Sequence, residues 1–257
     1  QKFSNDNQLL IVFSDISKLK TLEKMREDFI GNVSHELRTP ISVIKANSET
    51  LLSTKLIKDE NAINFTKAIQ SQSERMATIV NELLSISSME SGDYPISLDK
   101  LNIKNIVDSA IQELNPMTES SNIKLVNKIS DVTHIIGDES AIKIIISNYI
   151  TNAIKHSPDD EIIEIDNEKI DKDFCRIKVI DNGIGIAKKY RERVFERFFR
   201  VDKGRSKKIG GTGLGLSISK NLALMMGYSV GVESNEPKGS IFYIDVKIHQ
   251  ETSKEVA

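Results

Sequence analysis

The chain of 257 residues has one cysteine, no run of about 18 apolar residues and no excess of positive charge. A single cysteine, Cys175, excludes an intrachain disulfide and fits a reducing compartment. Its apolar surroundings at 174–180 predict a buried small side chain. The missing apolar run argues against a membrane-spanning helix in this sequence, and we expect no signal peptide in it. With 35 basic and 37 acidic residues, the net charge of -2 gives no basic face for nucleic acid.

Length and composition are those of a folded chain with room for two domains. Apolar residues make up 39% and charged residues 28% of the sequence, as in soluble globular proteins. The chain begins with Gln1, not Met, and enters directly on a strand-like run at 8–14. We therefore expect an excised fragment that starts at the end of an upstream module. The alternative is an unstructured end that carries a few apolar residues.

Two amphipathic helices are predicted between residues 18 and 91. In the first, over 18–52, apolar residues recur every three or four positions. Pro40 removes a backbone donor and clashes with the preceding turn, which predicts a bend just after His35. A polar turn is expected at 53–60, followed by a second helix with a heptad seam. The seam runs through Ala62, Phe65, Ile69, Gln72, Met76, Ile79, Leu83 and Ile86.

A single hairpin of these helices cannot bury both apolar stripes. Two hairpins paired as a four-helix bundle would bury them, so the sequence predicts a homodimer. The alternative is that the second helix packs against the C-terminal domain.

Beyond residue 91 the pattern changes to an alternation of helices and strands. Ser91, Gly92 and Pro95 mark a helix break and a linker. Helical patterns follow at 103–115, 138–156 and 213–226, and strand patterns at 123–129, 161–169, 173–180, 229–234 and 240–248. This mixture predicts an α/β sandwich in which helices cover one face of a mixed sheet.

One histidine on the first helix has the neighbours that phosphoryl transfer requires. His35 lies beside Glu36 and one helical turn before Thr39, within the string Ser34-His-Glu-Leu-Arg-Thr-Pro40. A neutral imidazole is a usable nucleophile near pH 7. Glu36 can hydrogen-bond the other ring nitrogen, orient the ring and take up its proton. A His-Glu pair alone is more often a surface pair, so this hypothesis depends on the whole string.

Four polar side chains share one face of the predicted helix at 138–156. Asn148 and Asn152 lie four residues apart, and Lys155 and His156 extend the same surface. Amide oxygens are hard ligands that suit Mg²⁺, which a triphosphate needs for charge neutralisation. The pattern alone is weak evidence, because asparagines on helices are common.

Two glycine-rich strings follow along the chain. Asp181 ends a strand-like run and precedes Gly183, Gly185 and Ile186. Its carboxylate can accept a hydrogen bond from the exocyclic amine of adenine, and the glycines let the backbone approach the base. The second string, Gly-Gly-Thr-Gly-Leu-Gly at 210–215, precedes a helix and presents backbone amides to phosphate oxygens. It lacks the Lys-Ser/Thr of a Walker A loop, which argues against a P-loop.

An aromatic string lies between the two glycine strings. Phe195, Phe198 and Phe199 are expected to anchor a lid that includes the basic run at 203–208, and Arg200 can reach phosphate oxygens. The alternative is that the phenylalanines simply belong to the core.

In order and spacing, these strings resemble the conserved boxes of HisKA-type sensor histidine kinases of two-component systems. The matching strings are the H-box (34–40), the N-box (148–156), the G1 box (181–186), the F-box (194–200) and the G2 box (210–216). They look closest to phosphate-regulon or cell-wall-type sensor kinases with an upstream PAS module. The resemblance implies a dimeric helical-hairpin domain, a four-helix bundle, followed by an α/β sandwich ATP-binding domain of the histidine kinase/chaperone ATPase type. The implied domains are the PAS-like end at 1–17, the dimerisation and phosphotransfer hairpin at 18–91 and the catalytic domain at 98–250.

The resemblance also implies a role for each matching residue. His35, Glu36 and Thr39 would be catalytic, with Thr39 positioning water for dephosphorylation of a partner. Asn148 would hold Mg²⁺, and His156 would lie against adenine where the family often has Tyr or Phe. The positions assigned to ATP are Asn148, Asn152, Lys155, His156, Asp181, Gly183, Gly185, Ile186, Arg200, Gly211, Thr212, Gly213, Leu214 and Gly215.

The function implied is ATP-dependent autophosphorylation of His35 and phosphoryl transfer to an aspartate of a separate response-regulator receiver domain, with phosphatase activity on that regulator. The full-length protein is then expected at the cytoplasmic side of the cell membrane. A chaperone or topoisomerase-type ATPase is one rival, which lacks an H-box. A dimeric pseudo-kinase scaffold is another rival. The intact Asn148, Asp181, Gly213 and Gly215 argue against it.

Overall fold

The computed structural model describes Phe29, Val33 and residues 36–51, 60–119, 121–130, 134–201 and 211–249. The chain divides into two compact units, Gln1–Met76 and Ala77–Ala257, with the border inside helix α2. His35, the expected strand at 8–14, the run at 203–208 and all but the last residue of the expected turn at 53–60 lie outside the described residues.

Two helical segments confirm the prediction of a helical N-terminal part. Residues 36–51 form one continuous helical run, which includes the buried Pro40, and α2 spans Glu60–Ser91. The bend after His35 stays a prediction. All eight seam positions of α2 are buried or half-buried, as the heptad pattern requires. Gly92 follows the last residue of α2 and has φ +80. Glycine adopts this left-handed conformation without steric cost, so it can end the helix here.

The last turns of α2 belong to the second compact unit. Ile86 and Met89 are 1% and 9% exposed and join the hydrophobic core formed by the C-terminal domain. The last turns of α2 therefore pack against that domain, and this packing does not exclude the predicted homodimer.

The second unit is a layered α/β structure, as predicted. Its helices are α3 (Ile103–Leu114), α4 (Glu139–His156) and α6 (Gly215–Met225), with single 3-10 turns at Asn115–Met117, Lys188–Tyr190 and Arg193–Phe195. Side chains cap two of the helices, because Asn102 accepts from Asn105 N before α3 and Asp138 accepts from Ala141 N before α4.

A mixed five-stranded sheet forms the other layer, in the order β2-β4-β5-β7-β6. Its strands are β2 (Lys124–Asn127), β4 (Ile162–Lys169), β5 (Phe174–Asp181), β6 (Ser229–Ser234) and β7 (Ser240–Lys247). Only β2 and β4 pair in parallel, so the predicted mixed sheet is confirmed. The sequence patterns missed a small antiparallel pair, β1 (Asp99–Asn102) with β3 (His134–Gly137).

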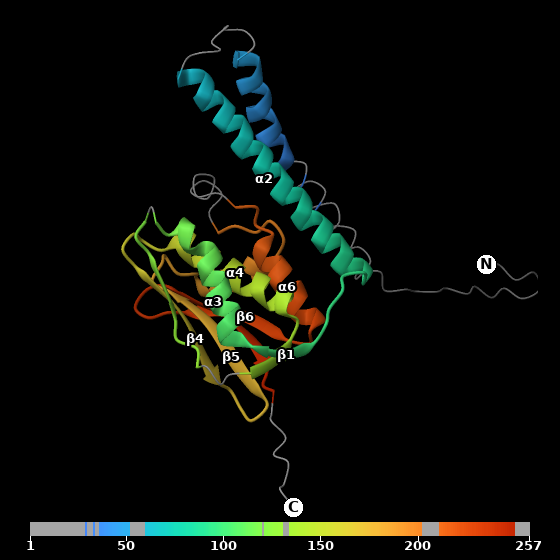
Figure 1. Cartoon of the computed structure of the whole chain (residues 1–257), viewed down its shortest axis with the longest axis vertical. Helices are drawn as coiled ribbons and strands as arrows, with labels where there is room; N and C mark the ends of the chain where they lie inside the picture. Colours follow the sequence, from blue (N-terminus) through green and yellow to red (C-terminus); the bar gives the residue numbers. More distant parts are fainter. Residues whose placement is uncertain are drawn as a thin grey trace, which may run out of the picture. The chain divides into compact units, whose positions relative to one another are not determined.

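The core lies between the sheet and the three helices, which cover the same face of the sheet (Figure 1). Along β5, every second residue is buried, which directs Cys175, Ile177, Val179 and Asp181 toward the helices. Cys175 is 2% exposed, and burial raises the pKa of its thiol to about 11, as expected of an inert core side chain. The same alternation therefore delivers one carboxylate, Asp181, to the helix side at the end of β5.

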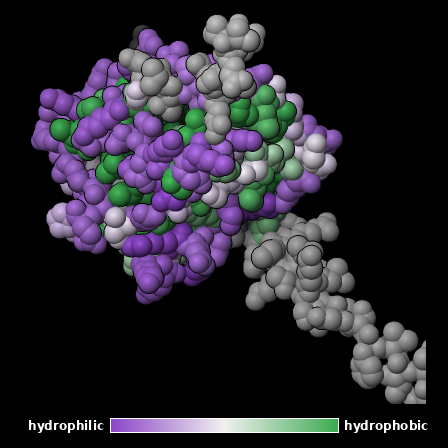
Figure 2. Space-filling model, turned by 90° about the horizontal axis from the view of Figure 1, so that it is seen from below, coloured by the Kyte–Doolittle hydropathy of each residue, from purple (hydrophilic) through white to green (hydrophobic). Residues whose placement is uncertain are grey.

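The other face of the sheet is polar. Arg176 donates to Asp245 at 2.7 Å and stacks over the Tyr243 ring at 3.6 Å. The face of the molecule drawn in Figure 2 is mostly hydrophilic, with separate apolar patches. In the described part of the chain, none of the helices is both long and apolar enough to cross a membrane.

Two isoleucines of α4 provide a matched test of this packing. Ile146 is fully buried, whereas Ile144 is 37% exposed on the same helix. We expect Ile146→Ala to lower the free energy of unfolding by about 2–5 kcal/mol, because it leaves a cavity. Ile144→Ala should cost less than about 1 kcal/mol. Urea unfolding followed by circular dichroism measures both, and equal losses would contradict the described core.

Candidate active site

Asn148 joins the N-box helix to the start of α6. Its Nδ2 donates to the carbonyl oxygen of Gly215 at 3.0 Å and to the hydroxyl of Ser219 at 3.1 Å. Because two acceptors hold the amide nitrogen, the orientation of the side chain is fixed. Among the described residues none donates a hydrogen bond to Oδ1 of Asn148, so this oxygen is available to a cation.

Asp181 of the G1 box is a buried carboxylate held by backbone amides. Its side chain is at the end of β5 and 3% exposed. Oδ1 accepts from the amides of Gly183 at 2.8 Å and Ser240 at 3.1 Å. Burial raises the pKa of Asp181, and the two amide donors oppose that rise only in part. The result is a single carboxylate in a dry position with a fixed orientation, suited to read one donor of a ligand.

The G1 box packs directly on the end of α4. A Cβ atom at Gly183 would lie 2.5 Å from the carbonyl oxygen of His156, so only glycine fits there. The amide of Ile184 donates to the same carbonyl at 3.3 Å. His156 therefore lies beside the G1 box. Burial, with the nearby cations Lys155 and Arg200, lowers the pKa of its imidazole and favours the neutral ring.

The F-box and the G2 box hold each other. The amide of Phe198 donates to the carbonyl of Gly213 at 2.8 Å, and Arg200 Nη1 donates to the carbonyl of Gly211 at 3.0 Å. Gly213 has φ +75, and a Cβ atom there would lie 2.9 Å from Phe198 Cα. Leu214, fully buried, directly precedes α6 and fixes the start of that helix.

Lys155 connects the N-box to the G2 box. Its Nζ lies 3.8 Å from the position that a Cβ of Gly211 would occupy. Burial lowers the pKa of Lys155, Glu82 opposes this shift and Arg200 adds to it. Two cations and the amide end of α6 thus face one region, which is an arrangement that favours an anionic ligand.

The structure therefore brings most of the predicted nucleotide residues together. Asn148 is hydrogen-bonded to Gly215, Lys155 lies near Gly211, and the carbonyl of His156 lies against Gly183. Asn152 and Ile186 are half-buried. Ile186 packs against the core, and its carbonyl accepts from Arg191 Nε at 3.4 Å.

One residue of this cluster escaped the sequence analysis. Glu82 of α2 accepts a hydrogen bond from Thr212 and interacts electrostatically with Lys155. A pocket of about 280 Å³ adjoins it, and Glu82 and Asn148 both line that pocket. No local pattern distinguishes Glu82 from a solvated charge beside the heptad seam.

On the helical run at 36–51, the structure describes Glu36 and Thr39 of the H-box. Glu36 Oε2 accepts from Arg75 Nη2 at 3.0 Å, and the two side chains are 22% and 28% exposed. Arg75, which the sequence analysis missed, therefore fixes the orientation of the carboxylate next to His35. Thr39 is exposed.

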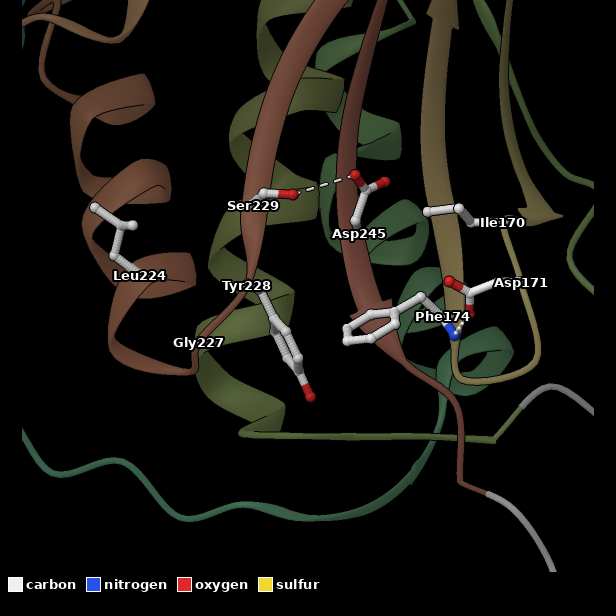
Figure 3. A pocket seen from close by; sticks show the side chains of 8 residues that line it. All are labelled: Ile170, Asp171, Phe174, Leu224, Gly227, Tyr228, Ser229 and Asp245. Carbon is white, nitrogen blue, oxygen red and sulfur yellow. Dashed lines mark hydrogen bonds between the residues drawn. The ribbon is translucent and has the colours of Figure 1, made fainter.

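A larger hollow of about 480 Å³ lies elsewhere, between α6 and the strands β5, β6 and β7 (Figure 3). The rings of Phe174 and Tyr228 line it, and Ser229 donates to Asp245 at 3.1 Å. None of the residues that line it was predicted for the site, and Asp245 already binds Arg176. The chemistry therefore favours the cluster around Asn148 over the larger hollow.

Two glycines with the same backbone conformation test the G2 geometry. Gly213→Ala should destabilise the domain and weaken nucleotide binding at least tenfold, because it combines a strained φ with a clash on Phe198. Gly227, at φ +77 with nothing near its Cβ position, provides the control for strain alone. Calorimetric titration and thermal unfolding compare the two variants. Equal effects of both would mean that the Phe198 contact is unimportant.

Comparisons with known proteins agree with the order of these segments. Residues 25–92 match the family described as His Kinase A (phospho-acceptor) domain. Residues 137–250 match the family described as Histidine kinase-, DNA gyrase B-, and HSP90-like ATPase. The first match distinguishes the chain from gyrase-type and chaperone-type ATPases.

Several sensor kinases are similar over most of the chain. The sensor-like histidine kinase SenX3 of Mycolicibacterium smegmatis is 34% identical over 94% of this chain and 63% of its own length. The sensor histidine kinase WalK of Bacillus subtilis is 34% identical over 95% of this chain and 40% of its own length. The phosphate regulon sensor protein PhoR of Pseudomonas aeruginosa is 33% identical over 93% of this chain and 54% of its own length. The chain thus spans about two fifths to just under two thirds of the length of these relatives.

Solved structures show the same fold. Full-length ShkA in complex with AMPPNP matches 87% of this chain and 46% of its own, with a TM-score of 0.65 and 24% identity. The histidine kinase ThkA in complex with the response regulator protein TrrA matches 92% and 68%, with a TM-score of 0.69 and 21% identity. With both family matches in order on one chain, the protein belongs to the HisKA-type sensor histidine kinases of two-component systems.

Proposed function

We propose that this chain transfers the γ-phosphoryl group of ATP to His35 and then to an aspartate of a separate response regulator. The observation that carries the proposal is the presence, on one chain, of a phospho-acceptor match and an anion-binding cluster built from the N, G1, F and G2 boxes. The alternative function is ATP hydrolysis without phosphorylation of the protein, and the H-box argues against it.

The nucleotide is proposed to lie between Asp181 and the G2 box. Asp181 accepts a hydrogen bond from the exocyclic amine of adenine, and His156 lies against the base. Lys155 and Arg200 bind phosphate oxygens together with the amides at Gly211, Thr212, Gly213, Leu214 and Gly215. Asn152 contributes a further polar contact to phosphate, and Gly183, Gly185 and Ile186 line the base. This assignment is supported by the fixed orientation of Asp181 and by the proximity of Lys155 to Gly211.

Asn148 is proposed as the protein ligand of Mg²⁺. Its Nδ2 is held by Gly215 and Ser219, so its Oδ1 presents a hard oxygen ligand. One protein oxygen fits this ion, which takes most of its ligands from phosphates and water. When bound, Mg²⁺ would neutralise the charge of the triphosphate. No group of three or more His, Cys, Asp or Glu side chains that could hold a metal occurs in the described part of the chain.

At the acceptor, Glu36 is proposed to orient the imidazole of His35 and to take up its proton. The attacking nitrogen then bonds to the γ-phosphorus as the bond to the β-phosphate oxygen breaks, and ADP leaves. Arg75 holds Glu36 in place at 3.0 Å. Most of the rate enhancement would come from positioning and charge neutralisation.

The same proposal covers the wider assembly. A homodimer is supported by the α2 seam and by the exposed Val80 (43%) and Leu84 (63%) on that helix. Sedimentation at a mass of one chain would contradict it. The proposed domains remain 1–17 for the end of a PAS-like module, 18–91 for the hairpin and 98–250 for catalysis. The full-length protein is proposed to act at the cytoplasmic side of the membrane.

Two variants separate the acceptor from the nucleotide site. His35→Ala should lose all labelling by γ-labelled Mg-ATP and keep nucleotide affinity within about twofold, because binding and acceptance use different residues. Asn148→Ala leaves the acceptor His35 in place but should weaken binding of Mg-ATP at least tenfold. That loss corresponds to about 1.4 kcal/mol of binding free energy. Autoradiography and calorimetric titration measure the two effects. Labelled His35→Ala protein would contradict the proposed acceptor.

Thr39→Ala tests the phosphatase assignment. Thr39 is exposed one turn after His35, where its hydroxyl can position water against the phosphoaspartate of the regulator. We expect this variant to autophosphorylate normally and to lose most of its dephosphorylation of the regulator, with Thr39→Ser as the control that keeps the hydroxyl. Unchanged loss of label from the phosphorylated regulator would refute the role of Thr39.

A further inference from the structure

Glu82 on α2 directs a carboxylate at residues proposed to bind phosphate. It accepts a hydrogen bond from Thr212 and attracts Lys155, and both lie in the same compact unit as Glu82. Thr212 belongs to the G2 box and Lys155 to the N-box. The contact thus reaches both phosphate-binding strings from a helix that belongs to neither.

The Glu82 side chain is half-buried, and its carboxylate is only partly hydrogen-bonded. Its second oxygen, Oε2, is a buried atom without a hydrogen-bond partner among the described residues. Burial raises the pKa of Glu82 despite the attraction of Lys155, which means that desolvation outweighs that attraction. A partly desolvated carboxylate with one unpaired oxygen is costly, so a better anion can displace it from Lys155.

The apolar contacts of α2 explain why the carboxylate lies there. Ile86, one turn after Glu82, is 1% exposed, and Met89 is 9% exposed in the core of the C-terminal domain. Arg197 of the F-box donates a hydrogen bond to Glu90. These contacts fix the last turns of α2 against the domain and present Glu82 to Lys155 and Thr212.

We propose that Glu82 occupies the phosphate position of the nucleotide-free protein and competes with ATP for Lys155 and Thr212. This inference rests on the proposed function. A carboxylate and a triphosphate cannot share one ammonium group without strong repulsion, since both are anions in a poorly solvated site. Nucleotide binding is thereby coupled to withdrawal of the Glu82 carboxylate from Lys155 and Thr212.

The test is the affinity of the whole chain for a non-hydrolysable ATP analogue with Mg²⁺, measured by calorimetric titration. Glu82→Gln removes the charge and keeps the size and an acceptor oxygen. It should bind the analogue about fivefold more tightly or better, in the usual range of coupling between two sites. Glu82→Ala, which also removes the acceptor, should gain at least as much.

Glu113→Gln is the matched control. Glu113 is an exposed carboxylate of α3 that pairs with Lys143, so this variant changes the net charge equally without touching Lys155 or Thr212. Its affinity should equal that of the wild type. A similar gain in Glu113→Gln would overturn the proposal, because net charge would then explain the effect.

Thermal unfolding gives a second, independent readout. Because the pKa of Glu82 is raised in the folded state, its ionisation opposes folding as the pH rises through that raised pKa. Glu82→Gln should therefore unfold at the same temperature as the wild type or higher at neutral pH, and this difference should vanish well below pH 4.5, the ordinary glutamate value.

The outcomes separate the two proposals. Tight binding by the wild type with equal or weaker binding by Glu82→Gln keeps the proposed function and overturns the role of Glu82. Absence of binding in both proteins overturns the proposed function and the inference with it. Tighter binding by Glu82→Gln, with Glu113→Gln unchanged, supports both.

Discussion

The hydrogen bonds from Asn148 to the first turn of α6 are the contact on which the candidate site depends. They join the two helices that carry the N-box and the G2 box, at 3.0 Å to Gly215 and 3.1 Å to Ser219. A Cβ atom at residue 215 would lie 3.1 Å from Asn148 Oδ1, so glycine permits the close approach. With α4 and α6 joined in this way, Lys155 faces Gly211, and His156 at the end of α4 meets the G1 box.

The helices and long strands could be predicted because their patterns repeat. Along β5 the alternation of buried and half-buried residues extends over eight positions, and the α2 seam continues through more than three heptads. The pair β1 and β3 could not be predicted. Each strand has four residues, and their partners lie far apart in sequence, so no local periodicity marks them.

The charged contacts of the site were hidden for a related reason. The heptad pattern places Glu82 and Arg75 beside the seam, where most charges are solvated, yet Glu82 meets Lys155 and Arg75 binds Glu36. Tertiary structure alone creates these pairs. In contrast, Asn148, Asp181 and the glycines were recognised because a family motif fixes their order. The motif does not report that burial and the nearby Arg200 lower the pKa of Lys155. The closeness of these two cationic side chains favours an anionic ligand.

The chemical stability of the phosphorylated protein tests the central claim most directly. After incubation with γ-labelled Mg-ATP, the protein is divided and treated with acid or with alkali. A phosphoramidate on histidine predicts label that is lost in acid and survives alkali. Label that survives acid, or steady release of phosphate with no labelled protein, would contradict a histidine kinase, and the second result would favour a simple ATPase.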